Sequence, residues 1–147
     1  MKNTFYLLLL CFFMACTNAN NGQNKAIENV NMTIVKQSFE YFNKYDWAKM
    51  ATLYMDNAEL WEPSMGQGVN KHTHAQIIQK FTELHKMVPD VHNEIGQMYP
   101  SSDKHVIVEY TSTGTGPDGK KFTLPMCSVY TFDNGKITRD MTYYDNF

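Results

Sequence analysis

Two carboxylic acids in this chain stand where acid–base chemistry is possible, and the first is Glu62. It ends a short β-rich run, Ala58–Glu62, and directly precedes Pro63. At the mouth of an apolar cavity, desolvation disfavours the charged carboxylate, which raises its pKa and lets it abstract a proton beside a carbonyl near neutral pH. The other interpretation is a solvated acid at a strand end, or a cap of the following loop. The residue types leave both interpretations open.

The second acid, Asp145, lies near the chain end with Tyr143. Side chains alternate between two faces along a strand, so the run Lys136–Tyr144 and the residue after it place Arg139, Met141, Tyr143 and Asp145 on one face and Asp140, Thr142 and Tyr144 on the other. A tyrosine hydroxyl beside Asp145 could donate a hydrogen bond to an enolate oxygen. The pattern does not decide which face is internal. The alternative is that Asp145 ends the strand at the surface. For Arg139 and Asp140 we predict a solvated rim and not an acid/base dyad, because adjacent residues of a strand point to opposite faces.

Three histidines, His72, His74 and His85, are the remaining candidates for chemistry. His74 and His85 are about 16 Å apart by helical rise, and no Cys or acid completes a tetrahedral set. We therefore predict no metal site and place these histidines at the surface or at a pocket rim. Gly66-x-Gly68 and Gly114-x-Gly116 lack the strand-to-helix turn that cradles phosphate, so no nucleotide cofactor is predicted.

The elements that must position these residues begin with a β-rich last third. Runs Phe122–Phe132 and Lys136–Tyr144 flank Asn134-Gly135, a pair that favours a tight hairpin because a type I′ turn needs positive φ at both central residues. Earlier runs, Val91–Tyr99 and His105–Thr115, add two more strands. The sequence thus predicts an antiparallel sheet with an apolar face that must be covered.

The first half predicts the helices that cover it. Asn29–Tyr45 has an apolar stripe, Asp46 can cap a short helix at Trp47–Tyr54, and Thr73 opens a helix to Val88 with a capping-box pattern. The stretch from Ser64 to Lys71 is expected to be loop. The predicted order is α-α-β-α-β-β-β-β: an α+β cone in which a curved antiparallel sheet wraps around three helices.

The N-terminus, residues 1–15, predicts a signal peptide. Lys2 precedes an apolar run, Phe5–Ala15, which is too short for the roughly 20 residues that span a bilayer. Small Ala15 before Cys16 resembles a bacterial lipobox, which implies acylation of Cys16, although Phe13 replaces the usual Leu. Residues 16–28 would then form a flexible tether, and 29–147 the domain. The predicted protein is exported and anchored to a membrane. The alternatives are an ordinary signal peptide cut nearby or an uncleaved anchor.

The charge of the chain limits its possible binding partners, and its cysteine content limits the possible thiol chemistry. Without Lys2 the chain has 12 Lys and Arg against 15 Asp and Glu, a net charge near −3, and it shows no basic patch. The sequence therefore predicts no nucleic-acid partner. Beyond the signal and Cys16, the one remaining thiol is Cys127, which we interpret as a small hydrophobic residue in a strand.

Several motifs in order support a resemblance to a known family. The segment FNKYDWAKMATLYMDNAELWEPSMGQGVNKHTHAQIIQKF contains a helix, an Asp-Trp step, an "LY-x-D-x-A" strand ending in acid-Pro, a Gly loop and a further helix. Val88-Pro89-Asp90 continues the pattern, and FDNGKITRDMTYYDNF closes it. Over residues 30–147 the chain resembles the SnoaL-like domains of the nuclear-transport-factor-2-like superfamily.

The resemblance implies a cone-shaped barrel with a hydrophobic pocket and a homodimer, in a superfamily that includes isomerases, cyclases, hydrolases, dehydratases and non-catalytic proteins. It implies cofactor-independent chemistry on a small hydrophobic molecule. Glu62 matches the acid-Pro position of similar isomerases, Asp145 the closing Y-x-D, and His72 the paired histidines of dehydratase-like relatives. The expected catalytic set adds Tyr143, and the expected ligand-binding residues are Trp47, Trp61, Tyr110, Met126 and Met141. A non-catalytic binding or assembly module is the alternative.

Overall fold

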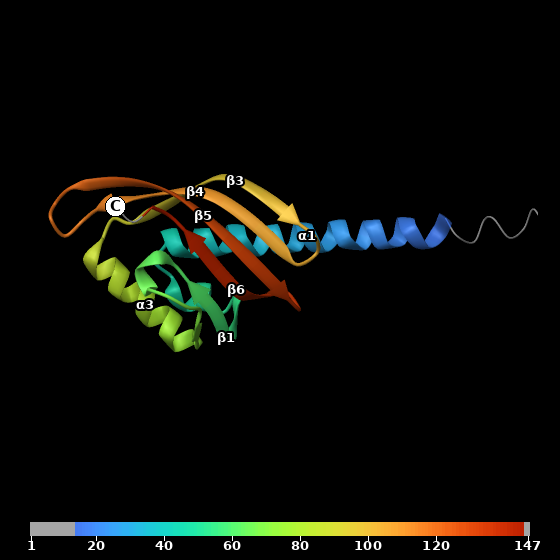
Figure 1. Ribbon diagram of the computed structural model, residues 1–147, viewed down its shortest axis with the longest axis horizontal. Helices are drawn as coiled ribbons and strands as arrows, with labels where there is room; N and C mark the ends of the chain where they lie inside the picture. Colours follow the sequence, from blue (N-terminus) through green and yellow to red (C-terminus); the bar gives the residue numbers. More distant parts are fainter. Residues whose placement is uncertain (1–13, 146–147) are drawn as a thin grey trace, which may run out of the picture.

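The structure, a computed structural model, describes residues 14–145. Its elements follow in the order α1 (Met14–Asn43), α2 (Trp47–Ala51), β1 (Tyr54–Trp61), the 3-10 turn η1 (Pro63–Met65), β2 (Asn70–His72), α3 (His74–Met87), β3 (His92–Ser101), β4 (His105–Thr115), β5 (Lys121–Asp133) and β6 (Lys136–Tyr143). Figure 1 shows the sheet lying across α1, with α3 to one side. The predicted α+β architecture, a curved sheet wrapped around three helices, is confirmed.

One six-stranded sheet forms the wall of the molecule, with strand order β2-β1-β6-β5-β4-β3. Neighbouring strands are antiparallel except β1 and β6, which run parallel. The parallel pair joins the first-half strands to the C-terminal meander and places β6 in the middle of the sheet. Because both edges of β6 are paired, its inward side chains project from the middle of the sheet and not from an edge.

Local signals in the sequence position several elements correctly. Asn134 and Gly135 have φ values of 48° and 71°, as the tight β5–β6 turn requires. The Asp46 side chain accepts from the Lys49 backbone N–H at the start of α2. Thr73 and Gln76 form the reciprocal capping box that begins α3. These capped and turned ends fix where α3 and β6 enter the fold.

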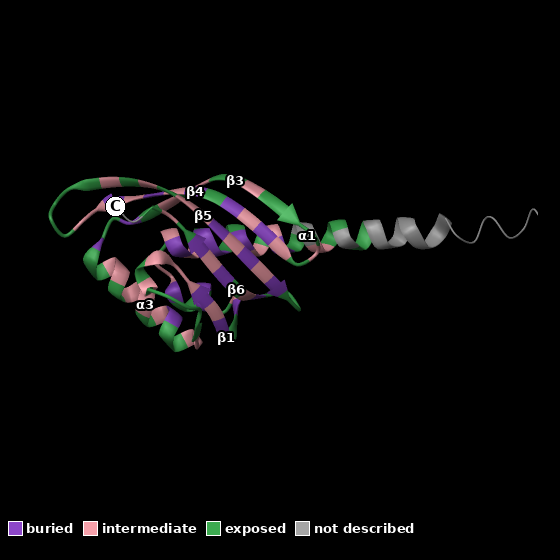
Figure 2. Ribbon diagram, in the orientation of Figure 1, coloured by how far each residue is buried: buried purple, intermediate pink, exposed green. Residues whose placement is uncertain are grey.

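The core lies between α1 and the concave face of the sheet. Val35, Phe39 and Phe42 of α1 are buried, and alternate residues of β4, such as Val106 and Val108, meet them from the sheet. Figure 2 shows this alternation of buried residues along the strands. The buried face of α1 also carries polar Asn31 and Ser38, whereas the apolar side chain of Val30 is 53 % exposed.

One prediction about a loop needs correction. The last two residues of the segment expected to be loop, Asn70 and Lys71, belong to β2, whose backbone pairs with β1. The segment predicted as a tether, residues 16–28, has helical backbone in the structure as part of α1, which begins at Met14. The segment holds no proline, and a helix already nucleated by packing gains one hydrogen bond for each residue added.

The N-terminal predictions are not addressed by the described residues. Residues 1–13 of the expected signal peptide lie outside them, as does the side chain of Cys16. None of the helices in the described part of the chain is both long and apolar enough to cross a lipid bilayer.

Candidate functional site

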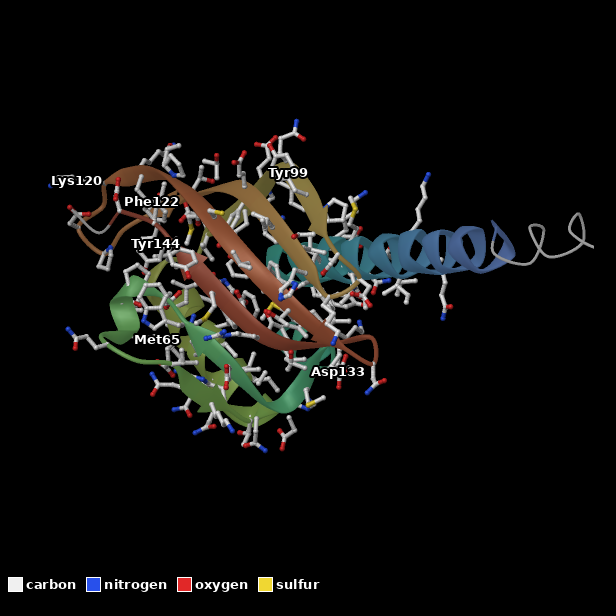
Figure 3. All side chains as sticks on the ribbon, turned by 45° about the vertical axis from the view of Figure 1, so that its right-hand side comes forward. Met65, Tyr99, Lys120, Phe122, Asp133 and Tyr144 are labelled. Atoms are coloured by element: carbon white, nitrogen blue, oxygen red, sulfur yellow. The ribbon has the colours of Figure 1, made fainter. Side chains whose placement is uncertain are left out.

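A cavity of about 390 Å³ opens between the helices and the concave face of the sheet. Its walls are mainly apolar and aromatic, and they include Phe39, Phe42, Met50, Leu60, Phe81, Leu84, Tyr110, Phe122 and Met126. In Figure 3, Met65, Phe122 and Tyr144 gather at one end of the molecule, far from Asp133 on the β5–β6 turn, and all three line the cavity. Its size and lining suit a small apolar molecule.

Asp140 of β6 is the most buried carboxyl group of this cavity, with 9 % of its surface exposed. The Tyr54 hydroxyl donates to its Oδ2 at 2.8 Å, and the Thr142 hydroxyl donates to its Oδ1 at 3.2 Å. Thr142 in turn lies 2.6 Å from the Ser128 hydroxyl, which lies 3.3 Å from that of Tyr110. Because an ionised carboxylate only accepts, these hydroxyls form a chain that points toward Asp140.

Burial raises the pKa of Asp140 from its ordinary 3.8 to about 6, because the charged form is poorly solvated. Hydrogen bonds from Tyr54 and Thr142 and the charge of Lys80 oppose this rise, whereas the charge of Glu62 adds to it. Burial also raises the pKa of Tyr54, so this phenol stays a hydrogen-bond donor. Asp140 can therefore take up and release a proton near neutral pH.

An extra residue in β6 turns Asp140 inward. The pairing with β5 passes from Phe132 opposite Ile137 to Thr131 opposite Arg139, so Thr138 forms a β-bulge. Ile137 and Asp140 are consequently both buried, although strict alternation from Ile137 would place Arg139 inside. The bulge sends Arg139 to the outer face, where its Nε lies 3.2 Å from Glu59.

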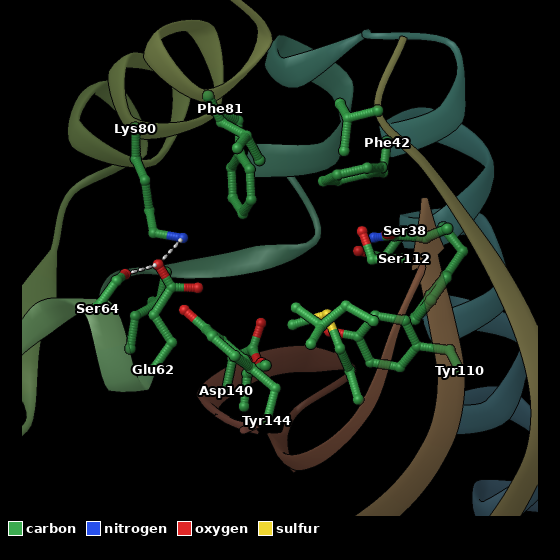
Figure 4. Close-up of a pocket in the computed structure, with 18 of the residues that line it drawn as sticks. Ser38, Phe42, Glu62, Ser64, Lys80, Phe81, Tyr110, Ser112, Asp140 and Tyr144 are labelled. Carbon is green, nitrogen blue, oxygen red and sulfur yellow. Dashed lines mark hydrogen bonds and ion pairs between the residues drawn. The ribbon is translucent and has the colours of Figure 1, made fainter. Parts of the chain in front are cut away.

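Glu62 supplies a second carboxylate on the same cavity wall. It follows β1 in extended geometry, and Pro63 then begins η1. The Glu62 Oε1 atom accepts from the Ser64 hydroxyl at 2.7 Å and lies 3.1 Å from the Lys80 Nζ. Lys80 reaches it from α3, passing over the Phe81 ring at 4.4 Å. Figure 4 shows Glu62, Ser64 and Lys80 converging on the side of the cavity that also holds Asp140 and Tyr144.

The sequence of this region identifies its family. The sequence profile of the SnoaL-like domain matches residues 35–140, more than half of the chain. The chain belongs to the SnoaL-like domain family. No curated protein matches it in sequence.

Solved structures show the same fold as this SnoaL-like domain. Bal32a, from a soil-derived mobile gene cassette, superposes with a TM-score of 0.72 at 21% identity, over 82% of this chain and 92% of its own. The epoxide hydrolase/cyclase-like enzyme SalBIII gives 0.70 at 21% identity, covering 80% and 92%. A protein from Jannaschia sp. CCS1 that is assigned as a SnoaL-like polyketide cyclase gives a TM-score of 0.70 at 15% identity, covering 81% and 88%. At these identities the likeness concerns the fold.

Four residues that the sequence singled out for this SnoaL-like domain line the cavity, namely Glu62, Trp61, Tyr110 and Met126. Trp47 does not line it; instead it packs in the core between Phe42 and Phe81. Met141, two residues after Arg139 on β6, lies on the same outer face of the sheet and does not line the cavity.

The remaining expected catalytic residues also lie outside the cavity lining. Tyr143 is 49 % exposed, and its ring lies tilted against that of Trp61 with the ring centroids 5.3 Å apart; Asp145 is exposed just beyond β6. His72 lies in β2, where its Nδ1 is 3.2 Å from the carbonyl oxygen of Asn70. The structure thus gives Tyr143, Asp145 and His72 no place beside the cavity.

Two charged residues of the cavity lining were missed from the sequence. Asp140 was expected on a solvated rim with Arg139, and the bulge at Thr138 reverses that expectation for Asp140 alone. Lys80 belongs to no sequence motif. Its one local signal is its position directly before Phe81, which lies on the apolar side of α3. Among the described residues, no three His, Cys, Asp or Glu side chains are placed to hold a metal ion.

Proposed function

We propose that this SnoaL-like domain binds a small apolar carbonyl compound and catalyses a proton transfer beside the carbonyl, without a cofactor. The observation that carries this proposal is Asp140: a carboxyl group in an apolar cavity, hydrogen-bonded by Tyr54, with a pKa of about 6. A base of that strength is mostly ionised at neutral pH yet basic enough to accept a proton from carbon. The reaction class is isomerase- or cyclase-type.

Each group near Asp140 has a defined part in such a reaction. The C–H bond beside the carbonyl breaks, its proton passes to the Asp140 carboxylate, and the electron pair moves to the carbonyl oxygen. The Lys80 ammonium stabilises the resulting enolate by charge, while Glu62 and Ser64 hold Lys80 against the cavity wall. In an isomerisation, Asp140 then returns the proton to another carbon. In a cyclisation, the enolate carbon attacks a second carbonyl carbon, and Asp140 returns its proton to the alkoxide that forms.

Glu62 is the competing base. Its Oε1 atom is occupied by Lys80 and Ser64, and its carboxylate lines the same cavity as Asp140. In that assignment Asp140 keeps the proton and donates a hydrogen bond to the enolate oxygen. Substitution of each carboxyl in turn separates the two assignments, because only loss of the base abolishes proton abstraction.

Exchange of α-protons for deuterium tests the function without knowledge of the natural substrate. 2-Tetralone is small, aromatic and readily enolised, and its loss of C1 proton signal in D₂O is followed by NMR. We expect the wild type to exceed buffer, Asp140→Asn to fall to the buffer rate, and Asp145→Asn, an exposed acid outside the cavity, to match the wild type.

The same experiment separates the two classes of function. A non-catalytic ligand-binding or assembly module is the second candidate, since a largely apolar cavity binds ligands by burial alone. Binding of 2-tetralone without exchange above buffer favours that module. Exchange that persists in Asp140→Asn and disappears in Glu62→Gln assigns the base to Glu62.

The N-terminus and the assembly state add two further proposals. We propose that Cys16 carries a lipid that anchors the exported protein to a membrane, in keeping with the small residue before it and the preceding apolar run. We also propose a homodimer, the assembly that the family resemblance implies. Sedimentation of the purified domain at micromolar concentration tests the dimer, and a monomer mass would reject it.

A further inference from the structure

The cavity has a second polar end, built around Asn93 at the start of β3. The backbone of Asn93 is fixed from both sides: it pairs with Ser112 of β4, and the Asn43 side chain bonds both its N–H, at 2.9 Å, and its carbonyl, at 2.8 Å. Its side chain lines the cavity. The buried Oδ1 of Asn93 has no hydrogen-bond partner among the described residues. A buried amide oxygen without a partner is costly unless some other group donates a hydrogen bond to it.

Ser112 adds a hydroxyl at the same place. It is 7 % exposed, lines the cavity, and faces Asn93 across the β3–β4 ladder, where directly paired side chains lie on one face of the sheet. Phe122, Leu124 and Val91 also line the cavity, so the two polar groups are set among apolar side chains.

This polar end is separate from the carboxylate end. Asp140 pairs with Tyr130 of β5, whereas Ser112 pairs with Leu124, six residues away along the same strand. Six residues of strand correspond to about 20 Å between the backbone positions. Figure 4 shows Ser112 across the cavity from Glu62 and Lys80, with the aromatic rings of Phe42 and Tyr110 near Ser112.

We infer that the ligand of this cavity is hydroxylated at the end opposite its carbonyl, and that Asn93 with Ser112 recognises that hydroxyl. A hydroxyl both donates and accepts, so it satisfies an amide in either orientation as well as a serine. The inference rests on the proposed function for the carbonyl end. It names the substrate class: an elongated, largely apolar molecule with a carbonyl at one end and a hydroxyl at the other.

Two matched pairs of probes test the inference at two ligand lengths: 2-tetralone with 6-hydroxy-2-tetralone, and 2-acetylnaphthalene with 2-acetyl-6-hydroxynaphthalene. Dissociation constants come from isothermal titration. In the wild type we expect the hydroxylated member of at least one pair to bind ~5- to 10-fold more tightly, the effect of one satisfied hydrogen bond at a polar site.

Asn93→Leu keeps the side-chain shape and the backbone bonds to Asn43 but removes the amide, so the preference should disappear in this variant. Thr111→Val is the matched control, because Thr111 neighbours Ser112 on the same strand but faces the opposite side of the sheet. Urea midpoints confirm that each variant folds. We expect Thr111→Val to retain the wild-type preference.

Three results would overturn the inference. Equal or weaker binding of the hydroxylated member in both pairs shows that no hydroxyl is recognised, even where α-proton exchange proceeds and the proposed function stands. A preference that survives in Asn93→Leu places recognition elsewhere. If neither member of either pair binds the wild type, the proposed ligand class fails and the inference fails with it.

Discussion

The buried carboxyl of Asp140 should make the stability of this domain fall as pH rises. Its folded pKa of about 6 exceeds the ordinary value of 3.8, so between these pH values the folded state binds more protons than the unfolded chain. Stability therefore decreases as pH rises through that window. At 1.36 kcal/mol per pKa unit, the full difference is about 3 kcal/mol.

Asp140→Asn removes this pH-dependent cost. Asparagine keeps an oxygen that can accept from Tyr54 at the position of Oδ2, and its amide can donate to Thr142. We expect the free energy of unfolding of the variant to exceed that of the wild type by about 3 kcal/mol at pH 7.5. This difference should shrink as pH falls, and its pH-dependent component should vanish below pH ~4. Such a gain in the free energy of unfolding is expected when a functional group that is strained or poorly solvated is replaced.

Urea unfolding at pH 4 to 8, followed by the fluorescence of buried Trp47 and half-buried Trp61, measures the effect. Asp133→Asn on the exposed β5–β6 turn is the control for an Asp-to-Asn change away from the cavity. A difference between Asp140→Asn and wild type that stays constant with pH would refute the reasoning. So would a wild type that gains stability over the variant as pH rises.

Three further predictions follow from local geometry and from the N-terminus. Gly114→Ala should lower the free energy of unfolding by about 1–3 kcal/mol in urea titrations, because a Cβ there would lie 2.5 Å from Val88 Cγ1; an unchanged midpoint would contradict this packing. Thr73→Ala should cost about 1 kcal/mol by removing the capping box of α3, and Thr73→Ser should restore most of it. Cys16→Ser should move the exported protein from the membrane fraction to the soluble fraction, and retention in the membrane would argue against lipidation.

Local sequence signals predicted much of the fold because they act over a few residues. Asn134-Gly135 has the positive φ values that its hairpin turn requires, and the Thr73 capping box begins α3 where expected. Both devices use hydrogen bonds or dihedral preferences that a short peptide already contains. Strand β4, His105–Thr115, has the bounds that the sequence predicts.

The candidate site was predicted less completely because its arrangement depends on strand register. A single bulge at Thr138 decides whether Asp140 or Arg139 enters the cavity, and the sequence alone does not mark that bulge. The sequence also leaves open which face of β6 is internal. Tyr143 and Asp145, which lie on the outer face, could therefore not be told apart from residues that enter the cavity. Glu62 was found because acid-Pro after a strand is a local motif, whereas Lys80 reaches Glu62 only through tertiary packing of α3 against β1.

The polar residues on the inner face of α1 were also hard to predict. Asn31 and Ser38 are buried, and Asn31 donates to the carbonyl of Asp103 at 2.9 Å, in the β3–β4 turn. Hydrophobic periodicity assigns such residues to solvent, because their partners lie far away in the sequence. Ser38 lines the cavity, whereas Asn31 is not among its lining residues and is held by the β3–β4 turn.

The pH dependence of α-proton exchange in 2-tetralone tests the central claim most directly. If Asp140 is the base, the exchange rate of the wild type should rise with pH and level off with an inflection near 6, since only the ionised carboxylate accepts a proton. Asp140→Asn should lack both the rate and the inflection, and Asp145→Asn should keep them. Exchange that is equally fast in Asp140→Asn, or no faster than buffer in the wild type, would contradict the account.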